Sequence, residues 1–276
     1  MKSDSAREVK VPWVKGLEKS EKGELFFAGE ALTPRLAGLR DQIPAYFLSL
    51  EVVRSRAKTY RDTLAAVLKQ KLHFHFAMKS NNHPELLQML AAEGYGVDVV
   101  SGGELEVAMN HGFQAKDVVF SGVAKTKKEL ELALKVDVGQ INVESFPELV
   151  RIGQVARAFN RKARIAIRFN PEVKAETHPY ITTGFRENKF GVDALDLPEM
   201  TDHLLKNQDL YDFEGLSLHI GSQLLDFAAL EDAIHKTRKV EEELKARGLN
   251  AKSLDVGGGV GIAYRGTEEE DLETLN

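Results

Sequence analysis

Short apolar runs and amphipathic stretches alternate along most of this chain. From Leu72 onward, runs of strand length are separated by stretches whose apolar residues recur at helical spacing. The expected strands are 73–79, 97–101, 118–122, 140–144, 164–170, 214–221 and 253–257, and the expected helices include 84–93, 103–111, 127–136, 146–159, 198–207 and 227–247. This alternation predicts parallel strands joined by right-handed crossovers.

The predicted fold class is therefore α/β. A (β/α)₈ barrel is the favoured architecture, and an open doubly wound sheet is the alternative. A complete barrel of this type has eight strands in about 250 residues. The pattern from Leu72 gives only about seven strands, so we expect a barrel that lacks its last strand.

The first part of the chain follows a different pattern. Residues 1–45 mix charges with isolated apolar residues and show strand-like pieces but no sustained helical period. The run 46–49 predicts a strand, and 52–69 predicts a helix with one apolar face. We therefore expect an N-terminal extension over residues 1–45, packed on another part of the protein, and a barrel domain over 46–276.

Composition and charge limit the classes of partner and ligand that we expect for this protein. The 276 residues carry a formal net charge of -5, which gives no reason to expect nucleic acid or an anionic membrane as a partner. The chain contains no cysteine, so disulfides and thiolate metal sites are excluded. The N-terminal residues have no apolar core of signal-peptide length, and no later stretch is as long and apolar as a membrane span. A cytoplasmic protein that binds a small molecule is expected.

Polar residues stand where the predicted strands end. In a (β/α)₈ barrel the active site lies at the carboxyl ends of the strands. An arginine and a histidine inside apolar runs are costly to bury unless a ligand or an opposite charge satisfies them. The strand-end residues are Lys79, Asp98, Glu104, Ser121, Asn142, Glu144, Arg168, Asn170, His219, Ser222 and Asp255. Strand ends are often polar turns, but this set predicts a shared site.

A glycine-rich run indicates the kind of ligand. Gly257, Gly258 and Gly259 follow the last predicted strand and leave backbone N–H groups uncovered, as in loops that bind phosphate. The run is no Walker A motif, because no Gly-Lys-Ser/Thr follows, and a flexible turn is the alternative. A phosphate loop, the strand-end Lys79 and His219 are together what a pyridoxal 5'-phosphate site requires. No metal site is predicted.

Several segments together resemble the fold-type III pyridoxal-phosphate-dependent decarboxylases. The resemblance runs in order from about residue 44 to the end of the chain. It rests on 76–81, 97–105, 119–126, 141–145, 168–171, 177–184, 187–191, 219–223 and 255–259. His178-Pro179-Tyr180 and Asn188-Lys189-Phe190-Gly191 resemble the branch of this family that acts on diaminopimelate.

The resemblance implies a role for each candidate residue. Lys79 would form the imine with the cofactor, and His219 would stack on its ring. The phosphate would lie among Ser222, Gly257, Gly258 and Gly259. A polar shell around the lysine and the ring would consist of Asp98, Glu104 and Arg168. The implied reaction is decarboxylation of meso-diaminopimelate to L-lysine, the last step of lysine biosynthesis, with a small amino acid as substrate.

The carboxyl-terminal part of the sequence departs from the family pattern. Family members continue into an eighth strand with a Glu-Pro-Gly-Arg-like segment and then into a β-sheet domain that completes a homodimer. In this chain an acidic run, 268–271, stands near the end. We expect a homodimer where that region is supplied and impaired activity where it is missing. The alternatives are an inactive short homologue that binds pyridoxal phosphate or a protein partner, and a racemase or cofactor carrier of the same barrel type.

Overall fold

The computed structural model describes residues 17–39, 42, 44–173, 190–224 and 227–262. The chain divides into two compact units. Unit 1 comprises Met1–Gln70 and Gly261–Asn276, and unit 2 comprises Lys71–Val260. These two units do not begin or end at residue 45, and the expected domain boundary there stays a prediction.

Unit 1 contains a small antiparallel meander and two helices. Strands β1 (Leu17–Lys19), β2 (Leu25–Phe27) and β3 (Glu30–Ala31) pair in sequence order. Helix α1 (Leu32–Gly38) follows at once, and helix α2 (Leu50–Val67) agrees with the expected helix to within two residues. The short helix α1 has no counterpart in the sequence prediction.

The strand expected over 46–49 is wrong. These residues form irregular backbone, and Tyr46 is fully exposed. Ser49 caps α2, because its side chain accepts a hydrogen bond from the Val52 backbone N–H at 3.3 Å. Because Ser49 is the N-cap of α2, the helix begins directly after it, and the short extended run before it pairs with no described strand.

Unit 2 contains a parallel sheet of seven strands. They are β4 (His75–Ala77), β5 (Gly96–Val99), β6 (Val118–Phe120), β7 (Gln140–Val143), β8 (Ala163–Arg168), β9 (Tyr211–Ser217) and β10 (Ser253–Asp255). Each strand pairs with its neighbour in the sequence, so the order β4 to β10 never reverses. A doubly wound sheet reverses its order at a switch point. The expected incomplete TIM-type barrel is therefore confirmed.

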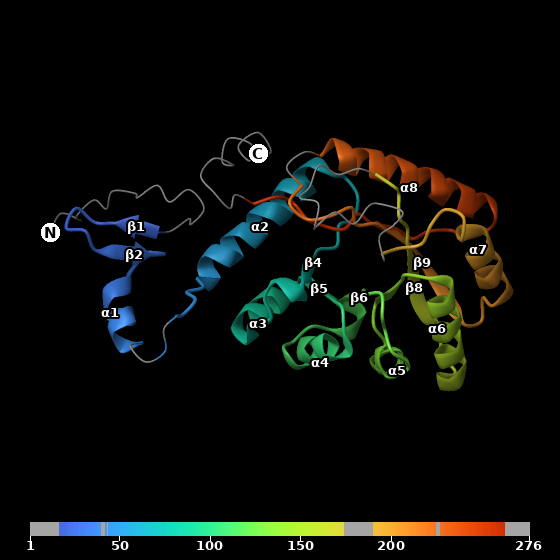
Figure 1. Cartoon of the computed structure of the whole chain (residues 1–276), viewed down its shortest axis with the longest axis horizontal. Helices are drawn as coiled ribbons and strands as arrows, with labels where there is room; N and C mark the ends of the chain where they lie inside the picture. The colour runs from blue at the N-terminus through green and yellow to red at the C-terminus, as the bar shows by residue number, and fades with distance from the viewer. Residues whose placement is uncertain (1–16, 40–41, 43, 174–189, 225–226, 263–276) are drawn as a thin grey trace. The chain divides into compact units, whose positions relative to one another are not determined.

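Helices lie on the outside of this curved sheet (Figure 1). They are α3 (Pro84–Ala92), α4 (Gly102–Asn110), α5 (Lys127–Val136), α6 (Phe146–Phe159), α7 (Leu197–Lys206) and α8 (Ala228–Ala246), with two 3-10 turns, η1 (Met78–Ser80) and η2 (Ala115–Asp117). The curvature brings the first and last strands close. Burial lowers the pKa of His75 on β4, and the Asp255 carboxylate on β10 opposes that shift.

The sheet separates an apolar layer from a polar interior. Alternate strand residues such as Phe120, Ile141 and Ile165 are almost fully buried. Most positions between them are small or polar. By register these positions share the other face of the sheet: Ala77, Asp98, Val119, Asn142, Ala166, Arg168, Ser217 and Asp255. Side chains of a strand alternate between faces, so these polar groups collect inside the barrel.

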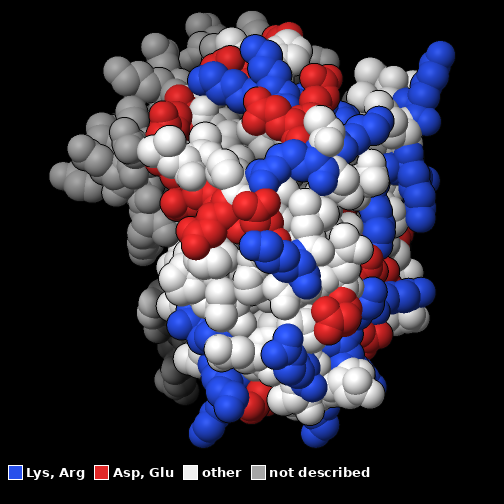
Figure 2. All heavy atoms as spheres, turned by 90° about the vertical axis from the view of Figure 1, so that its right-hand side faces the viewer, with Lys and Arg blue, Asp and Glu red and all other residues white. Residues whose placement is uncertain are grey.

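Charged side chains of both signs are mixed on the surface. Figure 2 shows lysine and arginine lying beside aspartate and glutamate over one face. Exposed ion pairs such as Arg247 with Asp202 contribute little each. Within the described residues, no helix is both long enough and apolar enough to cross a membrane.

Gly153 on α6 allows a tyrosine of β9 to pass beneath the helix. The Tyr211 hydroxyl donates a hydrogen bond to the Leu149 carbonyl at 2.9 Å and lies 3.0 Å from Nε2 of His203. Burial raises the pKa of Tyr211 to about 12, so the phenol keeps its proton. A Cβ on residue 153 would overlap the hydroxyl oxygen.

We predict that Gly153→Ala lowers the free energy of unfolding by about 1–3 kcal/mol, because the new methyl group displaces this hydroxyl in a packed region. Urea denaturation of the chain measures the effect. The matched control is Gly103→Ala on α4, where the nearest atom to a new Cβ is the Ser101 hydroxyl at 3.9 Å. Equal losses in the two variants would contradict the packing explanation.

Candidate active site at the carboxyl ends of the strands

Three successive helices begin at this edge of the sheet with the same capping pattern. In each, a Ser or Thr side chain accepts a hydrogen bond from the N–H of a glutamate three residues later: Ser101 with Glu104, Thr126 with Glu129, and Ser145 with Glu148. The glutamate side chain then accepts a backbone N–H at the start of the helix. The caps fix the loops that follow β5, β6 and β7.

Lys79 lies just past β4, in the 3-10 turn η1, and its side chain is exposed. Its ammonium group interacts electrostatically with Asp98 at the end of β5 and with His219 just after β9. Three predicted site residues from three separate strands are therefore close together. Lys79 stands free of the core, where a small molecule can reach its amine.

The Asp98 carboxyl group titrates close to neutral pH. Burial raises its pKa to about 6, and the nearby Asp255 adds to the rise. The Ser121 hydroxyl opposes the shift by donating a hydrogen bond to Oδ1 at 2.5 Å, as do the charges of Lys79 and Arg168. Nδ2 of Asn142 donates to the same hydroxyl oxygen at 3.0 Å. Asp98 can therefore hold or release a proton under ordinary conditions.

His219 is held neutral. Burial, helped by the positive charges of Arg168 and Lys79, lowers its pKa to about 4. At neutral pH the ring is an uncharged aromatic surface that can pack flat against another ring.

Arg168 at the end of β8 is fixed on two sides. Nη1 donates to Oε1 of Glu144 at 2.7 Å, and the guanidinium group lies 5.0 Å from the centre of the Phe190 ring. The other oxygen of Glu144 accepts the Gly191 backbone N–H at 2.9 Å. Glu144 thus joins Arg168 to the 190–192 segment, which pairs with the end of β8 through Phe169 and Val192.

The glycine run lies beside the loop that follows β9. The Leu224 N–H donates to the Gly259 carbonyl at 2.8 Å. A Cβ on Gly259, at φ +98°, would overlap the Gly221 carbonyl oxygen, and one on Gly257 would come within 2.5 Å of the Leu218 carbonyl oxygen. At Gly258 a Cβ would have no heavy atom within 4 Å among the described residues, apart from its own chain neighbours. The glycines thus permit a close approach of two loops and leave bare backbone facing open space.

The structure gives Glu104 a different immediate contact from the predicted one. Its carboxylate accepts the Val100 N–H at 2.7 Å as part of the α4 cap. Its place in a shell around the cofactor stays a prediction, as do the roles of Ser222 and the other candidates. Lys125 and Glu148 are buried and bind the backbone of Asn142 and Glu144, but neither was among the site residues predicted from the sequence. The only signal was a lysine directly before the capping Thr126.

Comparison with known proteins identifies the class. Residues 50–276 match the model for the pyridoxal binding domain of pyridoxal-dependent decarboxylases, and the chain belongs to this family. The chain is 42% identical over 230 residues to the diaminopimelate decarboxylase of Campylobacter jejuni, covering 83% of this chain and 56% of that protein. It is 38% identical over 248 residues to the Aquifex aeolicus enzyme, covering 90% and 57%.

Solved structures agree with this. Diaminopimelate decarboxylase from Helicobacter pylori, complexed with L-lysine, has a TM-score of 0.77 at 34% identity and covers 86% of this chain and 62% of its own. The M. jannaschii enzyme, also in complex with L-lysine, has a TM-score of 0.83 at 29% identity, with 95% and 61% covered. The resemblance found in the sequence is confirmed, and so is pyridoxal phosphate as the cofactor of the family. The chain spans little more than half the length of the curated relatives.

We predict that Ser121→Ala raises the pKa of Asp98 above 6, by roughly one pH unit, because the carboxylate loses a hydrogen bond that favours its charged form. Carboxyl ¹³C NMR of the chain follows the titration directly. Thr126→Ala is the control, since Thr126 caps α5 and contacts Glu129. An Asp98 midpoint at or below the wild-type value in Ser121→Ala would rule out this assignment.

Proposed function

We propose that this chain is the cofactor-binding part of a decarboxylase that removes a carboxylate from meso-diaminopimelate and yields L-lysine. The observation that supports this most directly is the meeting of Lys79, Asp98 and His219 at the carboxyl ends of three strands. A lysine amine, a titratable carboxyl group and a neutral imidazole are what a pyridoxal-phosphate enzyme uses to bind its cofactor and move protons.

The residues present fit pyridoxal phosphate. Bare backbone at Gly258 and the exposed Ser222 beside Gly259 offer donors for a phosphate group. The uncharged ring of His219 can cover the pyridine, and the Lys79 amine is accessible. When bound, this cofactor withdraws electrons from the bonds at the Cα of an amino acid and so weakens the bond to its carboxylate.

Each side chain then has a separate task. Lys79 would hold the cofactor through Nζ, an exposed amine that can serve as a nucleophile once it has given up its proton. Asp98, with a pKa of about 6, can accept and release a proton close to that nitrogen. Burial keeps His219 uncharged, with Arg168 adding to the effect, and the positive charge of Arg168 would attract the carboxylate of a substrate.

The substrate is inferred from relatives. The H. pylori and M. jannaschii structures are named as diaminopimelate decarboxylases and contain L-lysine, the product expected here. Of the two segments that resemble the diaminopimelate branch, 178–180 and 188–189 lie outside the described residues, and Phe190 and Gly191 lie against Arg168 and Glu144. The relatives named here are decarboxylases, which favours this reaction over a racemase.

The remaining expectations belong to the same proposal. The complete protein is a cytoplasmic homodimer with a small-molecule substrate and without nucleic acid as a partner. Full activity depends on the part of the relatives' length that this chain does not span. Light scattering of the chain together with that part tests the dimer.

We predict that borohydride treatment after addition of pyridoxal phosphate leaves the reduced adduct on Lys79, because this is the accessible amine at the strand ends. Visible absorption follows binding, and peptide mass spectrometry locates the adduct. Lys79→Met should lose both signals.

The matched control is Lys116→Met. Lys116 is also exposed and also sits in a 3-10 turn, η2, but this turn lies at the amino end of β6. Its replacement should leave the absorption band and the adduct unchanged. An adduct scattered over surface lysines in the wild-type chain would refute the cofactor site.

A further inference from the structure

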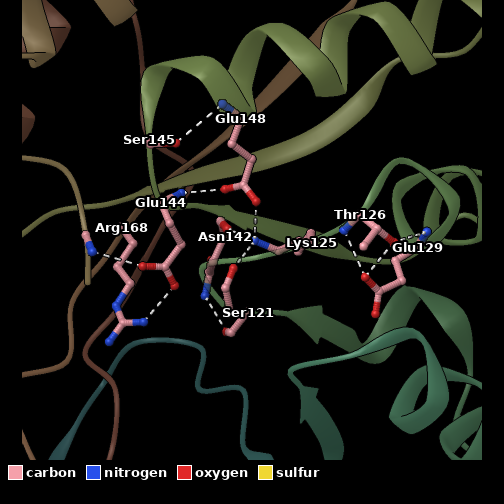
Figure 3. Close-up of polar contacts among 11 residues, drawn as sticks. Ser121, Lys125, Thr126, Glu129, Asn142, Glu144, Ser145, Glu148 and Arg168 are labelled. Carbon is pink, nitrogen blue, oxygen red and sulfur yellow. Dashed lines mark hydrogen bonds and ion pairs between the residues drawn. The ribbon is translucent and has the colours of Figure 1, made fainter. Parts of the chain in front are cut away.

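A lysine that the proposed reaction does not use is completely buried beside the site. The side chain of Lys125 is 0% exposed, and its Nζ donates to the Gly122 carbonyl at 2.7 Å, the Asn142 carbonyl at 2.7 Å and Oε1 of Glu148 at 3.1 Å (Figure 3). An ammonium group has three N–H donors, so these three acceptors use all of them.

The partner Glu148 is equally buried, with a side chain 2% exposed. Its Oε2 accepts the Glu144 N–H at 2.7 Å, while Oε1 accepts from Lys125. The ion pair therefore holds the short segment Asn142–Glu144 at two points: its first carbonyl and its last N–H. Both are backbone groups, so the pair fixes the path of the chain where β7 ends.

The side chains of this segment lead directly to the site. Asn142 donates to Ser121, which donates to Asp98. Glu144 binds Arg168, whose charge affects both Asp98 and His219. Figure 3 shows the contacts that run from Glu148 at the start of α6 through Glu144 to Arg168, and the Asn142–Ser121 hydrogen bond beside them.

We propose that Lys125 and Glu148 are positioning residues, which hold the Asn142–Glu144 segment so that Arg168 and the Asn142–Ser121 hydrogen bonds set the charge around Lys79 and His219. They touch neither cofactor nor substrate. The inference rests on the proposed cofactor site, but its test uses the chain without cofactor.

A purely structural role makes a different prediction from a positioning role. Burial is the main cause of both the raised pKa of Asp98 and the lowered pKa of His219. General loosening lets water in, so the pKa of Asp98 falls while that of His219 rises. Displacement of Arg168 removes a positive charge, so both pKa values rise. The direction of the Asp98 shift separates the two roles.

The test compares the chain with the double variant Lys125→Met/Glu148→Gln. Removing one partner alone would leave a buried charge uncompensated, whereas the pair of changes is neutral and close in volume. NMR titration of the cofactor-free protein gives the two midpoints. We expect both to rise, each by roughly half a pH unit or more. The more conservative pair Lys125→Gln/Glu148→Gln is also neutral and keeps an amide donor at position 125. It should shift both midpoints in the same direction by less, and it serves if the first double variant does not fold.

Leu204→Ala on α7 is the control for lost stability, because Leu204 is buried in the core and has no part in the network. Any loosening that it causes can only move the two midpoints in opposite directions, so it should not raise both. Midpoints unchanged in the Lys125 and Glu148 variants, or moving in opposite directions, would overturn the positioning role. Failure to trap pyridoxal phosphate on Lys79 would overturn the proposed function instead, so the two can fail separately.

Discussion

The constraint on which this structure depends is the sequential pairing of parallel strands. Because each strand of unit 2 pairs with the next one along the chain, every crossover runs in the same sense and every carboxyl end reaches the same edge. Lys79, Asp98 and His219 are far apart in the sequence, and the pairing of the strands alone brings them close together at this edge. The inward face can be polar because the outward face carries the apolar contacts with the helices.

Polar groups at that edge are only partly hydrated, and this determines their chemistry. Burial is the largest cause of the shifts at both Asp98 and His219, and it acts in opposite directions on an acid and a base. The result is a carboxyl group with a pKa of about 6 close to an imidazole with a pKa of about 4. Arg168 can lie among them because Glu144 neutralises its charge. The site thus depends on compensation between neighbouring charges.

The sequence predicted regular elements well where the hydrophobic period was strong. The seven strands and six of the helices after Leu72 lie within a few residues of their expected places, because alternation and helical spacing there reflect burial on known faces. The strand over 46–49 failed because apolar residues alone do not distinguish an extended run from the approach to the Ser49 cap. Helix α1 is too short to show a period.

For the candidate site, the sequence predicted candidate residues better than it predicted their contacts. Strand-end chemistry and the glycine run made Lys79, His219 and Gly257 candidates from the sequence alone, and their roles stay predictions. The Ser-x-x-Glu spacing is typical of a capping contact for Glu104. Its place after a strand led instead to the prediction of a site residue. Lys125 could not be recognised, because a lysine before a helix is ordinarily exposed, and only packing shows that its side chain points inward.

The buried charge at Lys125 raises the question of why an apolar residue does not stand there. Apolar replacements of buried ion pairs are often tolerated where the pair binds only itself. Here the pair also satisfies two carbonyls, of Gly122 and Asn142, and the N–H of Glu144. An apolar side chain at 125 would leave the two carbonyls without this donor, and one at 148 would leave the Glu144 N–H without its acceptor, at a cost of about 1–3 kcal/mol for each buried group. Burial lowers the pKa of Lys125, and the Glu148 carboxylate opposes that shift. The main role of this ion pair is therefore to bind the backbone groups that follow β6 and β7, and the attraction between its two charges is secondary.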